Sequence, residues 1–354
     1  QREVSFDAIT GRAVLDFAIS PDNNLYFSYS RGYKSGGINP PLSPVFAVSE
    51  SFDSEKIDAF EIGSKNSFLN GAAQVNLTGF YYKYKGLQLS RIVARTSVND
   101  TIDANIWGVE LETILRPSYN WMVNMNVSYL NAKVAGDQFF SNPRDPGGGD
   151  PDAVIIKDLS NGSLCAVTGA GANAFVGAVN AGLGLQGPAA FPADGGIAST
   201  GAFSICSVLD AQTANPAFAA LGPIDVLSPG VEVNLRGNRL PQAPEYKASV
   251  GVQYTADFDN GMSLVPRFDL AYTGEQYGNV FNGNVNRIEP FVQANASITL
   301  NGNDNRWFVR GFVQNIFDSD SVTGLYVTDA SSGNFTNIFT LDPRRYGIAI
   351  GAKF

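Results

Sequence analysis

The sequence predicts an all-β protein, an antiparallel meander of about 11 strands that forms part of a transmembrane β-barrel. Three observations lead to this prediction. Apolar and polar residues alternate with a period of two in many segments, as they do in strands that have two different faces. The connections between these segments alternate between short polar turns and long stretches. No run of 18 apolar residues occurs, so no membrane-spanning helix is predicted.

The final segment, 344–354, shows the alternation most plainly. One face carries Tyr346, Ile348, Ile350 and Phe354, whereas the other face carries small residues and a lysine. An apolar stripe with an aromatic residue at each end suits a strand that faces lipid, because aromatic side chains favour the two membrane interfaces. The alternative is an ordinary strand of a soluble sandwich, and the other segments decide between the two.

Ten earlier segments repeat this pattern. In the clearest of them, Trp121, Val123 and Met125 face one side, while Asn124 and Asn126 face the other. The predicted strands are 12–20, 24–30, 55–67, 72–85, 106–116, 121–131, 246–258, 262–272, 291–300, 306–317 and 344–354.

The connections favour a barrel over a sandwich. Short turns at one rim and long loops at the other are typical of outer-membrane barrels, and a soluble sandwich has no reason to sort its connections in this way. Counting the strands places the end of the last strand on the short-turn side. The long connections are 31–54, 86–104, 132–244, 274–287 and 318–342.

Composition excludes several classes of function. The 354 residues carry a net charge of −9, so there is no basic footprint for nucleic acid. The chain has no histidine, which removes the usual base of Ser/His/Asp hydrolysis and the commonest metal ligand. We therefore predict no catalytic, cofactor-binding or metal-binding residues, and no enzyme activity.

Six short motifs, taken in order, resemble those of TonB-dependent outer-membrane receptors. They include Val313-Gln-Asn-Ile-Phe-Asp318 and Asp342-Pro-Arg-Arg-Tyr-Gly347, which leads into the terminal Phe354. Each motif carries little information alone, but the ordered set extends over nearly the whole chain. The other four are 26–39, 80–88, 108–112 and 238–244.

The resemblance implies a receptor that takes up a scarce ligand, such as an iron-siderophore, across the outer membrane of a Gram-negative bacterium. Such receptors resemble a barrel of about 22 strands around a plug domain. Residues 1–354 would then be the C-terminal half of the barrel, and no plug is recognisable in them. The implied partners are the TonB complex, acting through the missing N-terminal part, the barrel assembly machinery, outer-membrane lipid with lipopolysaccharide, and a small-molecule ligand.

Two other classes remain open. A passive porin or an adhesin barrel would share the alternation, although single-chain bacterial barrels have even strand numbers. An outer-membrane hydrolase would need a general base other than histidine. Uptake with and without TonB separates the receptor from the porin.

The insertion 132–244 is rich in glycine, alanine and proline, so it is either disordered or an extracellular lid that contacts ligand. It holds both cysteines, Cys165 and Cys206, which are too few for a zinc site without histidine. On a cell surface we expect them to form a disulfide.

Three groups of charged or polar residues have both a functional and a structural interpretation. Near the outer rim, basic and tyrosine side chains would meet an anionic ligand or simply water. Three aspartates in the insertion offer oxygen atoms to calcium, although the surrounding prolines favour a solvated turn. Four charged residues on the inner face would line the wall. The groups are Tyr33, Lys34, Arg91 and Arg95; Asp145, Asp150 and Asp152; and Glu110, Glu112, Arg267 and Asp269.

The terminal strand is also predicted to carry the assembly signal, at Phe354 and Tyr346, as the resemblance implies. Replacing Phe354 by aspartate should lower the outer-membrane yield of the intact protein, because a charge would interrupt the apolar stripe. The measurement is the amount of folded protein in isolated outer membranes. Wild-type yield of the Phe354→Asp variant would contradict this prediction.

Overall fold

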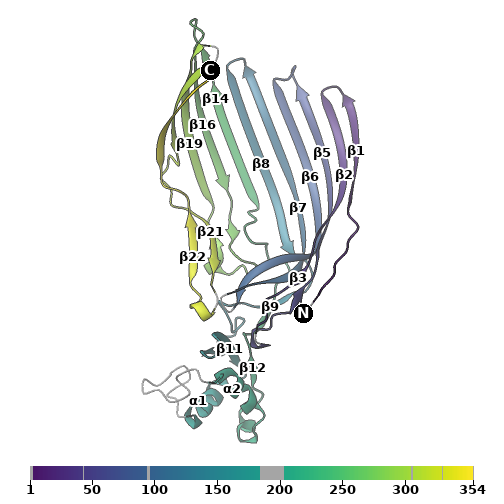
Figure 1. Cartoon of the computed structure of the whole chain (residues 1–354), viewed down its shortest axis with the longest axis vertical. Helices are drawn as coiled ribbons and strands as arrows, with labels where there is room; N and C mark the ends of the chain where they lie inside the picture. Colours follow the sequence, from purple (N-terminus) through teal and green to yellow (C-terminus); the bar gives the residue numbers. More distant parts are fainter. Residues whose placement is uncertain are drawn as a thin grey trace.

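The backbone is one curved antiparallel sheet in which neighbouring strands follow one another along the chain (Figure 1). We describe it from a computed structural model for residues 3–42, 44–93, 96–183, 203–303, 306–328 and 330–353. The predicted meander of about 11 strands is confirmed. The strands, in spatial order, are β1 (Gly11–Ser20), β2 (Asn23–Lys34), β5 (Glu55–Phe68), β6 (Ala73–Val93), β7 (Thr96–Ser118), β8 (Trp121–Val134), β14 (Tyr246–Tyr254), β16 (Ser263–Thr273), β19 (Phe291–Asn301), β20 (Trp307–Gln314) and β23 (Arg345–Ala352).

Small differences from the predicted strand bounds occur where the ladder is interrupted. The segment 246–258 divides into β14 and the short β15 (Ala256–Asp257), which pairs with β16 alone. The segment 306–317 ends early as β20, because Asn315 leaves the extended conformation with a φ of 49°. Within the described residues, β1 and β23 are the two edges of the sheet.

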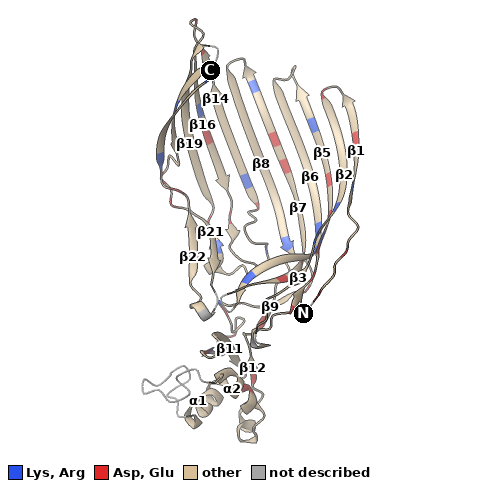
Figure 2. Cartoon of the chain, in the orientation of Figure 1, with Lys and Arg blue, Asp and Glu red and all other residues tan. Residues whose placement is uncertain are grey.

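The alternation in sequence becomes two chemically different faces. Leu15, Phe17 and Ile62 are more than 60% exposed, and Ile348 and Ile350 are each 76% exposed. So many exposed apolar side chains on one face would promote aggregation in water, whereas lipid accommodates them without cost. Charged residues are sparse on the strands (Figure 2).

Aromatic rings gather towards both ends of the strands. Near the short turns, the rings of Trp121 and Tyr254 lie 4.9 Å apart. Towards the long connections, Tyr129 lies 5.3 Å from Trp107 and 5.2 Å from Tyr246. Two belts of aromatic residues are the arrangement expected of a wall that meets a membrane interface at each rim. None of the helices in the described part of the chain has the length and hydropathy needed to cross a bilayer.

The connections lie as the sequence predicts. Short turns gather at one end of the sheet, where the C-terminus also lies, and the long connections gather at the other end (Figure 1). We call this second end the loop rim. The prediction of a loop over 86–104 is wrong. β6 continues to Val93 and β7 begins at Thr96, so most of this stretch is a paired hairpin. The glycine and polar residues of this stretch suggest a loop, but its backbone ladder resumes after a bulge between Tyr84 and Leu87.

The insertion contains a small folded unit of its own, which projects beyond the loop rim (Figure 1). We call Val154–Leu227 the loop module and describe its residues up to 183 and from 203 onwards. It consists of β10 (Val154–Asp158), β11 (Ser163–Thr168), α1 (Ala172–Gly182), α2 (Ile205–Thr213), η3 (Pro216–Leu221) and β12 (Asp225–Leu227). The strands form a three-stranded sheet, and the two helices pack on it. The disordered alternative is therefore wrong for the described part.

Apolar side chains and one disulfide hold the loop module together. Phe175, Val176 and Leu209 are fully buried and come from both helices. Cys165 on β11 and Cys206 on α2 are bonded, with an S–S distance of 2.09 Å. A stem formed by β9 (Phe139–Ser141) and β13 (Glu232–Asn234) connects the module to the rim.

One buried carboxylate organises the turn after β10. Asp158 is fully buried and accepts hydrogen bonds from Ser160 Oγ (2.7 Å), Asn161 Nδ2 (3.0 Å) and Ser204 Oγ. Ser204 also caps α2, because its Oγ accepts a hydrogen bond from the Ser207 N–H. Burial alone would raise the pKa of Asp158, but the donated hydrogen bonds outweigh it and the pKa is lowered.

Replacing Asp158 by asparagine should destabilise the loop module by about 1–3 kcal/mol at neutral pH, because an amide nitrogen would then face hydrogen-bond donors. Since the pKa is lower in the folded state, the stabilising contribution of Asp158 is present above the unfolded-state pKa of about 3.9 and is lost as pH falls below it. The measurement is the rate of proteolysis within the module at pH 7 and pH 3. Equal protection of both proteins at pH 7 would contradict the prediction.

Candidate ligand site at the loop rim

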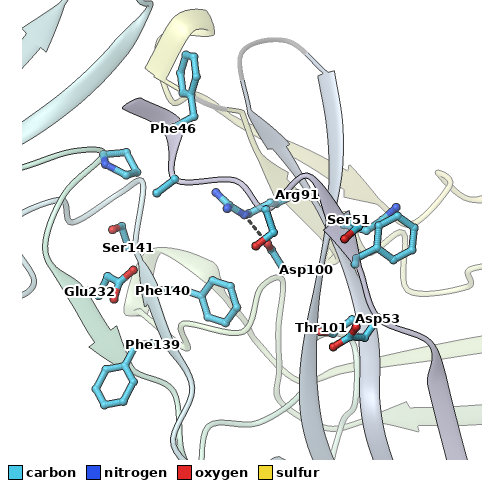
Figure 3. Close-up of a pocket in the computed structure, with 15 residues that line it drawn as sticks. Phe46, Ser51, Asp53, Arg91, Asp100, Thr101, Phe139, Phe140, Ser141 and Glu232 are labelled. Atoms are coloured by element: carbon cyan, nitrogen blue, oxygen red, sulfur yellow. Dashed lines mark hydrogen bonds and ion pairs between the residues drawn. The ribbon is translucent and has the colours of Figure 1, made fainter. Parts of the chain in front are cut away.

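A cavity of about 300 Å³ lies at the loop rim, between three segments that are distant in sequence. We call it the rim cavity. Its walls come from the connection 46–53, the β6–β7 hairpin, and the stem of the loop module (Figure 3). Its aromatic residues are Phe46, Phe52, Phe139 and Phe140, and its charged residues are Asp53, Arg91, Asp100 and Glu232.

The first wall is fixed to the sheet by one buried amide. Asn39 is only 4% exposed, and its Nδ2 donates to the carbonyl oxygens of Ser49 and Asn99, each at 2.9 Å. The Asn99 N–H donates back to Asn39 Oδ1 at 2.8 Å. Because every polar atom of this amide group is paired across two segments, the connection 40–49 is held against β7 rather than left free in solvent.

The second wall exists because the β6–β7 hairpin changes direction at Gly86. This residue has a φ of 66°, and a Cβ there would lie 2.7 Å from the Ser54 carbonyl oxygen. Its N–H donates to Asp103 Oδ1 at 3.0 Å, and the next polar side chain, Gln88, donates to the Ser35 carbonyl at 2.8 Å. The bulge therefore directs the outer half of the hairpin towards the other loops.

The second wall carries an ion pair. The Arg91 guanidinium contacts the Asp100 carboxylate across the β6–β7 hairpin (Figure 3). The side chain of Arg91 is 35% exposed and that of Asp100 is 14% exposed. The positive charge of Arg91 is thus already balanced within the cavity.

A second cavity, of about 290 Å³, adjoins the first and shares Phe46, Arg91 and Phe140 with it. Its remaining walls are mostly apolar and include Leu164 of the loop module and Tyr326 of β21 (Val322–Val327). The loop module therefore covers part of the rim and contributes directly to a cavity wall.

Of the four predicted rim residues, one lines the cavities, two line neither cavity, and one lies outside the described residues. Arg91 lines both cavities. Tyr33 and Lys34 lie at the end of β2, opposite Lys56 and Glu55, and line neither cavity. Arg95 lies outside the described residues, as does Phe354, whereas Tyr346 is 74% exposed on the apolar face of β23.

The predicted wall residues lie on the inner face, where two of them, Arg267 and Asp269, contact each other. Arg267 donates to Asp269 Oδ2 at 2.9 Å and to Asn124 Oδ1 at 3.0 Å. Glu110 and Glu112 of β7 line a shallow hollow, to which residues of β8, β14 and β16 also contribute. These contacts give the inner face the polar character of a water-lined or plug-lined wall.

The aspartates of the insertion form an exposed turn. The Asp152 N–H donates to Asp150 Oδ1 at 2.9 Å, and the side chain of Asp145 is also exposed. Across the described ranges, no three acidic, cysteine or histidine residues gather as a metal-ligand set.

Sequence reasoning missed most residues of the rim cavity. Phe46 and Asp53 stand in the connection between β2 and β5, Glu232 stands in the insertion, and no motif links them. The pair Phe139-Phe140 is the one local signal, because two adjacent aromatic residues are unusual in a polar, glycine-rich insertion.

Comparisons with known proteins agree with this architecture. Residues 2–154 match the family model described as TonB dependent receptor-like, beta-barrel. No curated protein matches the sequence. Among solved structures, the ferric yersiniabactin uptake receptor FyuA from Yersinia pestis aligns with 96% of this chain at 17% identity and a TM-score of 0.57.

Two receptors from Acinetobacter baumannii are similar in the same way. The siderophore receptor PiuA aligns at 14% identity and the ferric preacinetobactin receptor BauA at 11%, each over 96% of this chain and with a TM-score of 0.53. The chain spans 36% of FyuA, 35% of PiuA and 36% of BauA. Residues 2–154 are therefore similar to the β-barrel of TonB-dependent receptors, and the chain as a whole shares the fold of these solved receptors.

Proposed function

We propose that the protein to which this segment belongs takes up a scarce small-molecule ligand across the outer membrane of a Gram-negative bacterium, with energy from the TonB complex. The observation that carries the proposal is the rim cavity, which lies at the loop rim of a receptor-type wall and adjoins a second cavity that the loop module helps to line. Such a site suits capture of a ligand from outside the cell. The solved relatives named as siderophore receptors support this class of transport.

In this proposal the segment supplies the wall and the lid. The apolar face meets lipid, while the polar inner face meets water or a plug domain. Further strands of the barrel would pair with the edges at β1 and β23, because hydrocarbon cannot satisfy unpaired backbone groups. The loop rim is the extracellular side, and the short turns are periplasmic. Assembly machinery and lipopolysaccharide are the other proposed partners.

The test is uptake by cells that carry the full-length gene, with and without a functional TonB protein. Radiolabelled iron supplied with a panel of siderophores is a suitable first readout, with a strain that lacks the gene as the control. We expect accumulation that requires both the gene and TonB. Uptake that persists unchanged without TonB would overturn the proposal and indicate a passive barrel.

A further inference from the structure

The charges around the rim cavity point to the class of ligand. Three carboxylates, Asp53, Asp100 and Glu232, and a single basic residue, Arg91, line the cavity. Arg91 is paired with Asp100. Within the described part of the chain, the carboxylates of Asp53 and Glu232 have no hydrogen bond or ion pair, and both residues are exposed. The cavity therefore has two negative charges that no described protein cation balances.

The two unbalanced carboxylates lie on opposite sides of the Arg91–Asp100 pair. Asp53 comes from the connection before β5, and Glu232 comes from β13 in the stem (Figure 3). The ring of Phe140 lies between them, and the ring of Phe139 lies on the Glu232 side of the cavity (Figure 3). Aromatic faces beside carboxylates favour a cation that is attached to an apolar body, because the ring quadrupole and the carboxylate charge both attract it.

The rest of the loop rim has the same sign of charge. In the connections 35–54, 86–105, 132–244, 274–290 and 318–342, the described residues include 17 Asp or Glu and seven Lys or Arg, an excess of ten negative charges. In the full sequence these connections hold 19 Asp or Glu and eight Lys or Arg, while the rest of the chain holds 14 and 16, so the excess of negative charge lies in the connections. A rim with one dominant sign of charge concentrates ligands of the opposite sign and speeds their capture.

We infer that the rim cavity binds an organic ligand with positive charge beside an apolar or aromatic body, and that it disfavours anions. This inference rests on the proposed function, because it assigns the ligand class of the same site. It also differs from the expectation that Lys34, Arg91 and their neighbours meet an anion. Arg91 is the one of them that reaches the cavity, and its charge is satisfied by Asp100.

The test uses two dyes with the same xanthene ring and opposite charge, cationic rhodamine 6G and anionic fluorescein. Binding to the purified full-length receptor in lipid nanodiscs is measured by fluorescence anisotropy, with empty nanodiscs subtracted. We expect rhodamine 6G to bind about tenfold more tightly than fluorescein and to weaken as salt is raised. Asp53→Asn and Glu232→Gln should each weaken its binding by about two- to fivefold, the range for one partly solvated charge pair.

Asp210→Asn is the matched control, because Asp210 is exposed on α2 and lies outside the cavity, so this change should leave the affinity unaltered. Equal or tighter binding of fluorescein, no binding of either dye, or unchanged affinity in the Asp53→Asn/Glu232→Gln double variant would overturn the inference. Failure of the proposed function is a separate result. It would appear as uptake that does not need TonB, whichever dye the cavity prefers.

Discussion

Replacing both Cys165 and Cys206 by alanine is expected to destabilise the loop module by roughly 4 kcal/mol while the sheet remains folded. The bond joins residues 41 apart in sequence, and closing a ring of that size removes much of the conformational entropy of the unfolded chain. Among its described residues the module has a core of ten buried residues, so it has little other stabilisation to offset the loss. Both sulfurs lie inside that core.

The measurement is limited proteolysis of the full-length receptor, followed by mapping of the cleavage sites. We expect rapid cleavage within Val154–Leu227 in the double variant and unchanged protection of the strands. Alanine is preferred to serine because it does not bury a hydroxyl group. If the module of the variant is as resistant as that of the wild type, the bond is not a main source of its stability.

Replacing Val127 by lysine should destabilise the barrel by about 2–4 kcal/mol, because it places a charge on the lipid-facing side near the middle of β8. Val127 is 40% exposed and lies between Leu111 of β7 and Ala248 of β14. Neither neighbour offers a partner for an ammonium group, so the charge would have to reach an interface or remain in hydrocarbon.

The adjacent residue provides the control. Asn126 points to the opposite face, where Glu112 is its partner on β7 and Ser249 its partner on β14. Lysine at this position would therefore lie next to a carboxylate in a polar environment. Urea unfolding of the full-length receptor in lipid vesicles, followed by the heat-dependent shift in gel mobility, compares the two variants. Equal loss of stability in both would contradict the assignment of the two faces.

The sequence was sufficient to predict the wall, because a strand encodes its two faces in every second residue. A period of two needs no knowledge of distant segments, so most of the strands, their order and the end of the sheet at which the long connections gather were predictable. The structural role of a motif residue can also be predicted from the sequence where its contacts are local. Asn315, for example, has a positive φ, and its Nδ2 donates to the Ser319 carbonyl at 2.8 Å, which ends β20.

The loop module shows where local pattern becomes ambiguous. The alanine- and glycine-rich stretch 172–182 suggests disorder, yet Phe175, Val176 and Val179 recur at helical spacing and are buried. These few apolar residues stabilise α1 only because they pack against α2 and the three-stranded sheet, with the disulfide between β11 and α2. A short helix of this kind depends on tertiary packing more than on its own propensity.

The rim cavity was decided by tertiary structure alone. Phe46, Arg91 and Glu232 are separated by up to 186 residues, and each stands in a different connection. They meet because Asn39 holds one connection against β7, Gly86 turns the β6–β7 hairpin, and the stem β9–β13 returns the insertion to the rim. Contacts between connections leave no periodic pattern in the sequence, because they depend on the direction in which each connection leaves the sheet.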